Sequence, residues 1–109
     1  IVKNTKITFL DFYQVFNKVK FAEIVLIKGL GNYVQFFMSD DQINTVYASL
    51  KNLIEKLPDE FMRVHNSYIV NLHHIDVIED NHIFLGQHKV PISANNRDCL
   101  ARRVNQNIL

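Results

Sequence analysis

The chain has 109 residues, 48% of them hydrophobic and 21% charged, and this size and composition predict one globular domain over residues 1–109. The single cysteine, Cys99, excludes an internal disulfide and fits a cytoplasmic protein, and no apolar run approaches the roughly 18 residues that a membrane-spanning helix needs. The net charge of only +1 gives little support to a polyanion partner, because phosphate binding depends on lysine and arginine.

The first third of the chain is expected to be rich in β-structure. Short runs at 7–10, 21–27 and 33–37 are dominated by β-branched and aromatic residues, which favour strands. Between the last two runs, residues 29–32 include two glycines, which adopt positive φ without strain. We therefore expect a hairpin turn there.

The middle of the chain changes its hydrophobic period. After turn residues at 39–41, residues 42–46 fit a further strand. Apolar residues then recur at spacings of three and four from Val46 to Leu57, and Pro58 ends the pattern. This period predicts one amphipathic helix of about three turns, with its apolar stripe facing the core.

The second half again consists of short strand-like runs separated by turn residues. These runs lie around Met62, around Ile69, and at 75–78, 82–85 and 88–92. Residues 96–105 form a weak helical pattern that carries three arginines. The chain is therefore predicted to be mainly β with one or two helices.

The residues that could support catalysis do not form a known arrangement. Ser67 and Ser93 have histidines nearby, but the chain has neither a nucleophile elbow nor a glycine-rich phosphate loop. The five histidines match no zinc-ligand spacing, and His73 and His74 cannot both serve one site if their segment is extended. We expect no enzyme activity, no cofactor and no metal, and a small histidine-based metallo-hydrolase is a minor alternative.

Asparagine and arginine occur in the predicted loops. Asn66 lies between two apolar runs, and Asn95, Asn96 and Arg97 follow the last strand. Asparagine can pair with adenine and arginine with guanine in the major groove of DNA. The same residue types more often serve ordinary turns and solvent-facing positions, so the composition of these loops alone favours that interpretation.

Residues 61–72, followed by Ile75 and Ile78 and then by residues 90–93, resemble the signature of the LytTR DNA-binding domain. In that family an aromatic residue precedes Arg-x-His-x-Ser-Tyr-x-Val-Asn, and a short hairpin and a Pro-Ile/Val-Ser element lead into a final helix. The resemblance covers residues 6–104, nearly the whole chain.

The resemblance implies an elongated, multi-sheet β domain of LytTR type whose loops enter the major groove of double-stranded DNA. It further implies sequence-specific binding and transcriptional regulation as the output domain of a bacterial two-component response regulator. Because the chain begins at Ile1, we expect it to be the C-terminal part of a longer protein. The expected partners are an N-terminal receiver domain, a cognate histidine kinase, and a second copy that forms a homodimer on direct-repeat half-sites.

The resemblance assigns DNA contacts to three loops, around 32–33, at 65–67 and at 93–97. Tyr33, Asn66 and Asn95 fall at its base-reaching positions, and Tyr33 can stack on a base, touch a thymine methyl group or bond a phosphate. Ten candidate DNA-binding residues result. They are Lys28, Tyr33, Arg63, His65, Asn66, Ser67, Ser93, Asn95, Asn96 and Arg97, of which Lys28, Arg63 and Arg97 are candidate phosphate contacts and His65 is equally a structural histidine.

Two departures from the family pattern affect the expected affinity. Many members carry a glutamate where Ile27 and Lys28 stand, and they place Arg or Lys just after the serine, where this chain has Ala94 and Asn95. We therefore expect moderate affinity for DNA or dependence on a dimer. The alternative is an interaction or sensory domain of the same fold that does not bind DNA.

Overall fold

The computed structural model describes residues 7–12 and 15–108, which fold into antiparallel sheets with two helices. The strands are β1 (Ile7–Phe12), β2 (Val15–Lys20), β3 (Ile24–Leu30), β4 (Tyr33–Met38), β5 (Ile43–Tyr47), β6 (Phe61–His65), β7 (Tyr68–Asn71), β8 (Val77–Glu79), β9 (His82–Leu85) and β10 (His88–Pro91). The helices are α1 (Leu50–Ile54) and α2 (Arg97–Asn105), and short 3-10 turns occur at Phe21–Glu23, Leu72–His74 and Ala94–Asn96.

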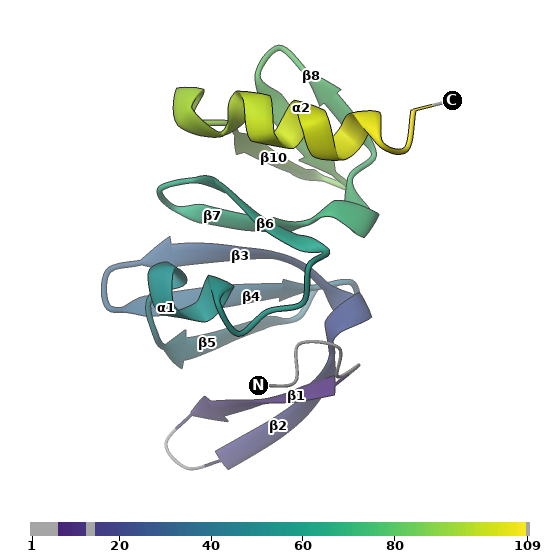
Figure 1. Ribbon diagram of the computed structural model, residues 1–109. Helices are drawn as coiled ribbons and strands as arrows, with labels where there is room; N and C mark the ends of the chain where they lie inside the picture. The colour runs from purple at the N-terminus through teal and green to yellow at the C-terminus, as the bar shows by residue number, and fades with distance from the viewer. Residues whose placement is uncertain (1–6, 13–14, 109) are drawn as a thin grey trace.

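The strands form three sheets that follow one another along the molecule. The hairpin β1–β2 comes first, a five-stranded sheet in the order β5-β4-β3-β7-β6 is central, and β10-β9-β8 forms the third sheet. Figure 1 shows this sequence from bottom to top, with α2 over the last sheet. The molecule measures 42 × 28 × 26 Å. The prediction of an elongated, mainly β, multi-sheet domain is confirmed.

The central strand β3 explains why the apolar run of residues 24–27 is continuous. Both faces of β3 are covered, and four successive residues are buried, whereas β4 alternates between more exposed and buried positions. A strand that is buried on both faces has an unbroken apolar sequence, and a strand that is covered on one face has a period of two. The five-stranded sheet is therefore the centre of the fold.

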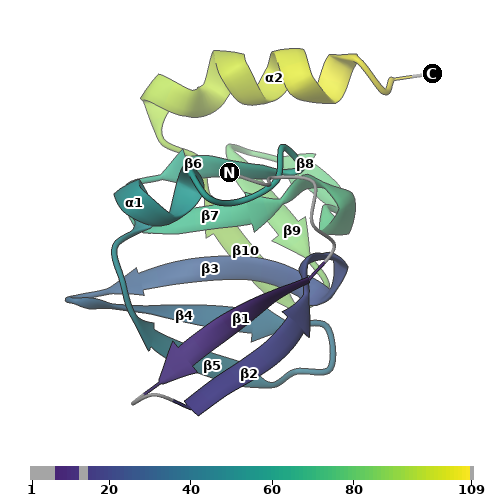
Figure 2. The same ribbon diagram turned by 60° about the horizontal axis from the view of Figure 1, so that its bottom comes forward.

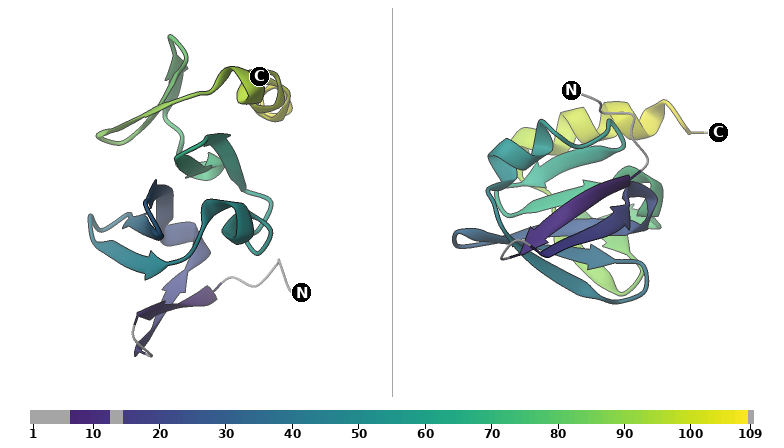
Figure 3. Two further views of the ribbon diagram at one scale, coloured as in Figure 1. Left: turned by 90° about the vertical axis from the view of Figure 1, so that its left-hand side faces the viewer. Right: turned by 90° about the horizontal axis from the view of Figure 1, so that it is seen from below.

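Two hydrophobic cores lie on opposite faces of this sheet. On one face Ile27, Phe36 and Ile69 pack with Leu50 of α1 and with Leu10 of the hairpin. Figure 3 shows α1 and the third sheet on opposite sides of the central strands.

On the other face, the central sheet packs against β9, β10 and α2. Leu26 and Val70 share this second core with Ile83, Val90 and Leu100. Leu100 is the buried residue of α2, so the helix is attached to the domain through one side only. Together the two cores connect all three sheets.

The turn predictions agree with the backbone geometry. Gly31 in the β3–β4 turn has φ +60°, which glycine adopts without steric strain. In the β8–β9 turn Asp80 and Asn81 have φ of 52° and 61°, as a two-residue type I′ hairpin requires. Asparagine and aspartate tolerate this region better than other non-glycine residues.

The predicted three-turn helix from Val46 to Leu57 is wrong in extent. Strand β5 continues to Tyr47, because Val46 and Tyr47 pair with β4, and α1 begins only after Ser49. The Ser49 side chain accepts a hydrogen bond from the backbone N–H of Asn52 and so caps the helix. Among the described residues no helix is long and apolar enough to cross a membrane.

Two predicted strands also change their bounds. Within the run at 21–27, Phe21–Glu23 forms a 3-10 turn and β3 begins at Ile24. The strand expected at 75–78 is β8, Val77–Glu79, because the buried Asn71 side chain accepts the His73 N–H and starts a 3-10 turn first. The other predicted strands and the helix near the C-terminus are confirmed with small shifts at their ends.

Candidate nucleic-acid interface

The three predicted contact loops lie along one edge of the molecule. The β3–β4 turn, the β6–β7 turn and the segment between β10 and α2 all lie at the left in Figure 1, and Figure 2 gives the same arrangement after rotation. The three loops therefore form one continuous edge, although they are far apart in the sequence.

Backbone hydrogen bonds fix neighbouring loops relative to one another. The Gly29 N–H, near the end of β3, donates to the Ser67 carbonyl in the second turn at 2.8 Å. The register of β6 and β7 shifts between Arg63 and His65, so that Val64 has no cross-strand partner in the ladder. Its carbonyl instead accepts the Ser93 N–H of the third loop at 2.8 Å.

Arg63 shapes the second loop. Its guanidinium Nη2 donates to the Asn66 carbonyl at 2.7 Å, and its Nε donates to the His65 carbonyl at 3.4 Å. The planar fork of the guanidinium suits two neighbouring acceptors. These bonds engage the backbone of Asn66, and its side chain is exposed at the tip of the loop.

His65 also supports this loop. Its Nδ1 accepts the Ser67 N–H at 3.1 Å, so in this arrangement the neutral ring carries its proton on Nε2. The His65 ring lies 5.8 Å from the ring of Tyr68, and the Lys28 Nζ lies 6.0 Å from the centre of that same ring. Lys28, Tyr68 and His65 thus form one cluster behind the second loop, and all three are partly buried.

The third loop is closed by two of its own polar residues. The Asn96 side chain donates to the Ser93 Oγ at 2.6 Å, and its backbone N–H donates to the Ser93 carbonyl at 3.0 Å. These bonds hold the 3-10 turn that leads into α2. Asn95 and Arg97 lie on either side of Asn96, and both are exposed.

The first loop carries an aromatic pair. Tyr33 is 40% exposed, and its ring packs edge to face on Tyr47 with 5.5 Å between ring centres and 80° between ring planes. Tyr47 is 73% exposed. Tyr47 was not among the predicted site residues, because the helical spacing placed it in a helix, although Ile43, Thr45 and Tyr47 share the period of two that marks one face of a strand.

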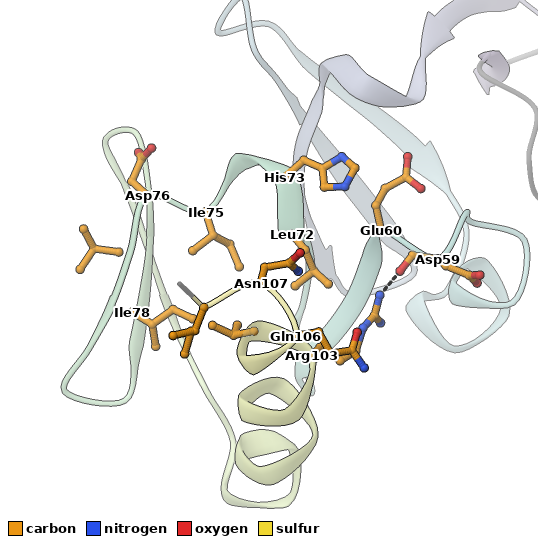
Figure 4. A pocket seen from close by; sticks show the side chains of 13 residues that line it. Asp59, Glu60, Leu72, His73, Ile75, Asp76, Ile78, Arg103, Gln106 and Asn107 are labelled. Carbon is orange, nitrogen blue, oxygen red and sulfur yellow. Dashed lines mark hydrogen bonds between the residues drawn. The ribbon is translucent and has the colours of Figure 1, made fainter.

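One cavity lies away from all ten predicted residues. About 690 Å³ in volume, it lies between the end of α2, β8 and the turn after β7 (Figure 4). Asp59, Glu60 and Asp76 line it together with Arg103, whose guanidinium donates to the Asp59 carbonyl, and its apolar wall includes Ile78. Carboxylates repel phosphate groups, so this cavity does not suit DNA.

The histidines are distributed over separate sites. The His74 Nε2 lies 2.6 Å from the Ala22 carbonyl, the His82 Nδ1 lies 2.8 Å from the Asp80 carbonyl, and the His88 ring packs against Phe37. Within residues 7–12 and 15–108, no three His, Cys, Asp or Glu side chains are grouped as metal ligands. The geometry of these residues therefore gives no support to the metallo-hydrolase alternative.

Comparison with known proteins gave two matches of interest. Residues 14–105 match the family model described as the LytTr DNA-binding domain. The fold is similar to a solved structure, the LytTr DNA-binding domain of a protein described as a methyl-accepting/DNA response regulator from Bacillus cereus. The TM-score is 0.79 and the identity 20%, over 93% of this chain and 98% of that chain. No match was found among curated proteins.

Proposed function

The chain belongs to the LytTR family of DNA-binding domains, and from this membership we propose that it binds specific sequences of double-stranded DNA through its three edge loops. Each loop would enter the major groove, and the bound domain would regulate transcription. Hydrogen-bonding side chains on loops can read base edges as a recognition helix does, provided that the fold holds the loops rigidly.

The observation that supports this proposal best is the common edge of the three loops. The hydrogen bonds from Gly29 to Ser67 and from Ser93 to Val64 limit the movement of each loop relative to the next. The molecule is 42 Å long, and one turn of B-form DNA is about 34–36 Å. The three loops occupy only the part of this length that holds the central and third sheets (Figure 1), so one domain can face at most about one helical turn of DNA.

The candidate residues have two kinds of proposed role: some contact bases or phosphates of the DNA, and others hold the loops in shape. Asn66 and Asn95 are exposed, and each offers a donor and an acceptor to a base edge. Arg97 and Lys28 would bind phosphate groups. Arg63 would hold the second loop and direct its remaining N–H donors to the DNA backbone.

The remaining candidates would act mainly on loop shape. The bonds between His65 and Ser67 and between Ser93 and Asn96 lie within their own loops. Such bonds fix the backbone beside a reading side chain, which lowers the entropy lost on binding.

The proposed setting is a response regulator. We expect residues 1–109 to form a single output domain behind a receiver domain that a histidine kinase phosphorylates. The third loop has Ala94 and Asn95 where many family members have a basic residue, so one copy would contact few phosphates. Two copies on direct-repeat half-sites would supply the missing affinity.

Selection from a pool of random duplex DNA at two salt concentrations tests the proposal. The wild-type domain should enrich one motif, and its affinity should fall as salt rises. Asn66→Ala and Asn95→Ala should lose the enrichment, whereas Asn107→Ala, at the opposite end of the molecule, should keep it. No enrichment by the folded wild-type domain would contradict the proposal and favour an interaction domain that does not bind DNA.

A further inference from the structure

Three large apolar side chains form one exposed row across the central sheet. Tyr33 of β4 pairs with Leu30 of β3 on one side and with Tyr47 of β5 on the other. Directly paired residues project from the same face of a sheet. Their exposed fractions are 53% for Leu30, 40% for Tyr33 and 73% for Tyr47.

The position of this row connects it with the three loops. Leu30 ends β3, Tyr33 begins β4, and only the two-residue turn lies between them. The row therefore lies at the end of the sheet that carries the proposed DNA-binding edge (Figure 1). Lys28, two residues before Leu30 on the same face of β3, adds a positive charge beside the row.

The two tyrosine side chains of the row are held in place before any partner binds. The two tyrosine rings pack edge to face at 5.5 Å, and both strands are fixed by cross-strand pairing. Rigid aromatic rings lose little conformational entropy on binding. Neither hydrophobic core includes these three residues, so burial within the domain does not account for them.

We infer that Leu30, Tyr33 and Tyr47 form an apolar surface that recognises thymine through its 5-methyl group. This inference rests on the proposed DNA-binding function. Thymine is the base that presents a methyl group in the major groove, and apolar side chains distinguish it by contact. The row would add a preference for A·T pairs next to the bases that Asn66 reads.

The test uses the duplex that the wild-type domain selects and replaces each thymine by uracil in turn. Uracil keeps the hydrogen-bonding groups of thymine and lacks only the methyl group. At one or two neighbouring positions the wild-type domain should bind the uracil duplex about fourfold more weakly, the value expected for one buried methyl group.

Variants assign this loss to the row. Tyr47→Ala and Leu30→Ala should bind the thymine duplex more weakly than the wild-type domain does. Each variant should bind the thymine duplex and the uracil duplex with equal affinity. Tyr47→Phe should behave as wild type, because the proposed contact needs the ring and not the hydroxyl. Ile43→Ala is the matched control, since Ile43 lies on the same face of β5 at its other end and is 52% exposed.

The outcomes separate this inference from the function on which it rests. Sequence-specific binding with no position sensitive to uracil, or a selected site without thymine, overturns the inference and leaves the function intact. A Tyr47→Ala variant that still distinguishes thymine from uracil also overturns the inference. A Tyr47→Phe variant that binds DNA as weakly as Tyr47→Ala does so too, because it indicates that the hydroxyl bonds a phosphate. Dimerisation of the free domain that Tyr47→Ala abolishes, with unchanged DNA binding, assigns the row to a second copy instead. Absence of any sequence-specific binding contradicts the function itself.

Discussion

Arg63 can serve through its positive charge, through the planar shape of its guanidinium, or through both. As a phosphate contact it would need only its positive charge, and as the support of the second loop it needs the guanidinium fork that holds the His65 and Asn66 carbonyls. A lysine keeps the charge and cannot reproduce the fork.

Replacement of Arg63 by lysine is expected to weaken specific DNA binding about tenfold, equal to about 1.4 kcal/mol, and Arg63→Ala to weaken it little further. The reason is that Asn66 loses its fixed position in both variants. Titration of the selected duplex measures this effect. An Arg63→Lys variant that binds as tightly as wild type would indicate that charge alone matters.

Asn71 has a structural role in the fold. Its side chain is fully buried, donates to the Ile24 carbonyl at 3.0 Å and the Phe21 carbonyl at 3.5 Å, and accepts the His73 N–H at 3.0 Å. It thereby connects the backbone at the start of β3 with the 3-10 turn that follows β7.

Replacement of Asn71 by alanine is expected to lower the free energy of unfolding by about 3 kcal/mol, because buried backbone groups lose their partners. Urea denaturation measures this loss. The exposed Asn105 provides the control, and Asn105→Ala should change the free energy by less than about 0.5 kcal/mol. Equal stability of the two variants would refute the structural role.

At the scale of elements, most strands and turns could be predicted, because period, β-branched residues and glycines mark them locally, but β2 (Val15–Lys20) was not predicted. The error between Val46 and Ser49 has a physical cause. Val46 and Leu50 fit a helical spacing, but pairing with β4 extends β5 through Tyr47, and the period of two at Ile43, Thr45 and Tyr47 is a weaker local signal than the helical spacing that follows it. Ser49 was the available sign of the true helix start.

Helix α1 depends on this cap because it has only five residues. Ser49→Ala should lower the free energy of unfolding by about 1 kcal/mol, since the N–H of Asn52 loses its acceptor. Ser49→Asp, which keeps an acceptor at the same position, should retain wild-type stability. Thermal denaturation of the three proteins decides the matter, and an Ala variant as stable as the Asp variant would contradict the capping role.

At the scale of the whole molecule, the family motif indicated which residues the loops contain. It did not indicate how the loops are arranged in space. Their common edge depends on long-range hydrogen bonds, such as the bond from Ser93 to Val64, that no local pattern reveals. Tyr47, the aromatic neighbour of Tyr33, was missed because the helical spacing from Val46 onward placed it in a helix.

The cavity beside Ile78 lies between β8 and the C-terminal end of α2, away from the three loops. Ile78→Gln is therefore expected to leave DNA affinity within about twofold of wild type, as titration of the selected duplex would measure.

The central claim is that three loops on one edge face successive parts of a DNA site, and tethered cleavage of the selected duplex tests it most directly. Cys99 is exposed and is first replaced by serine. A cleaving reagent is then attached to single cysteines at Asn32→Cys, Ser67→Cys or Ala94→Cys, with Ile108→Cys at the far end as the control. The account predicts three separate cleavage sites in the order of the loops and no cleavage from position 108. Coincident sites, or cleavage from position 108 as strong as from the loops, would contradict it.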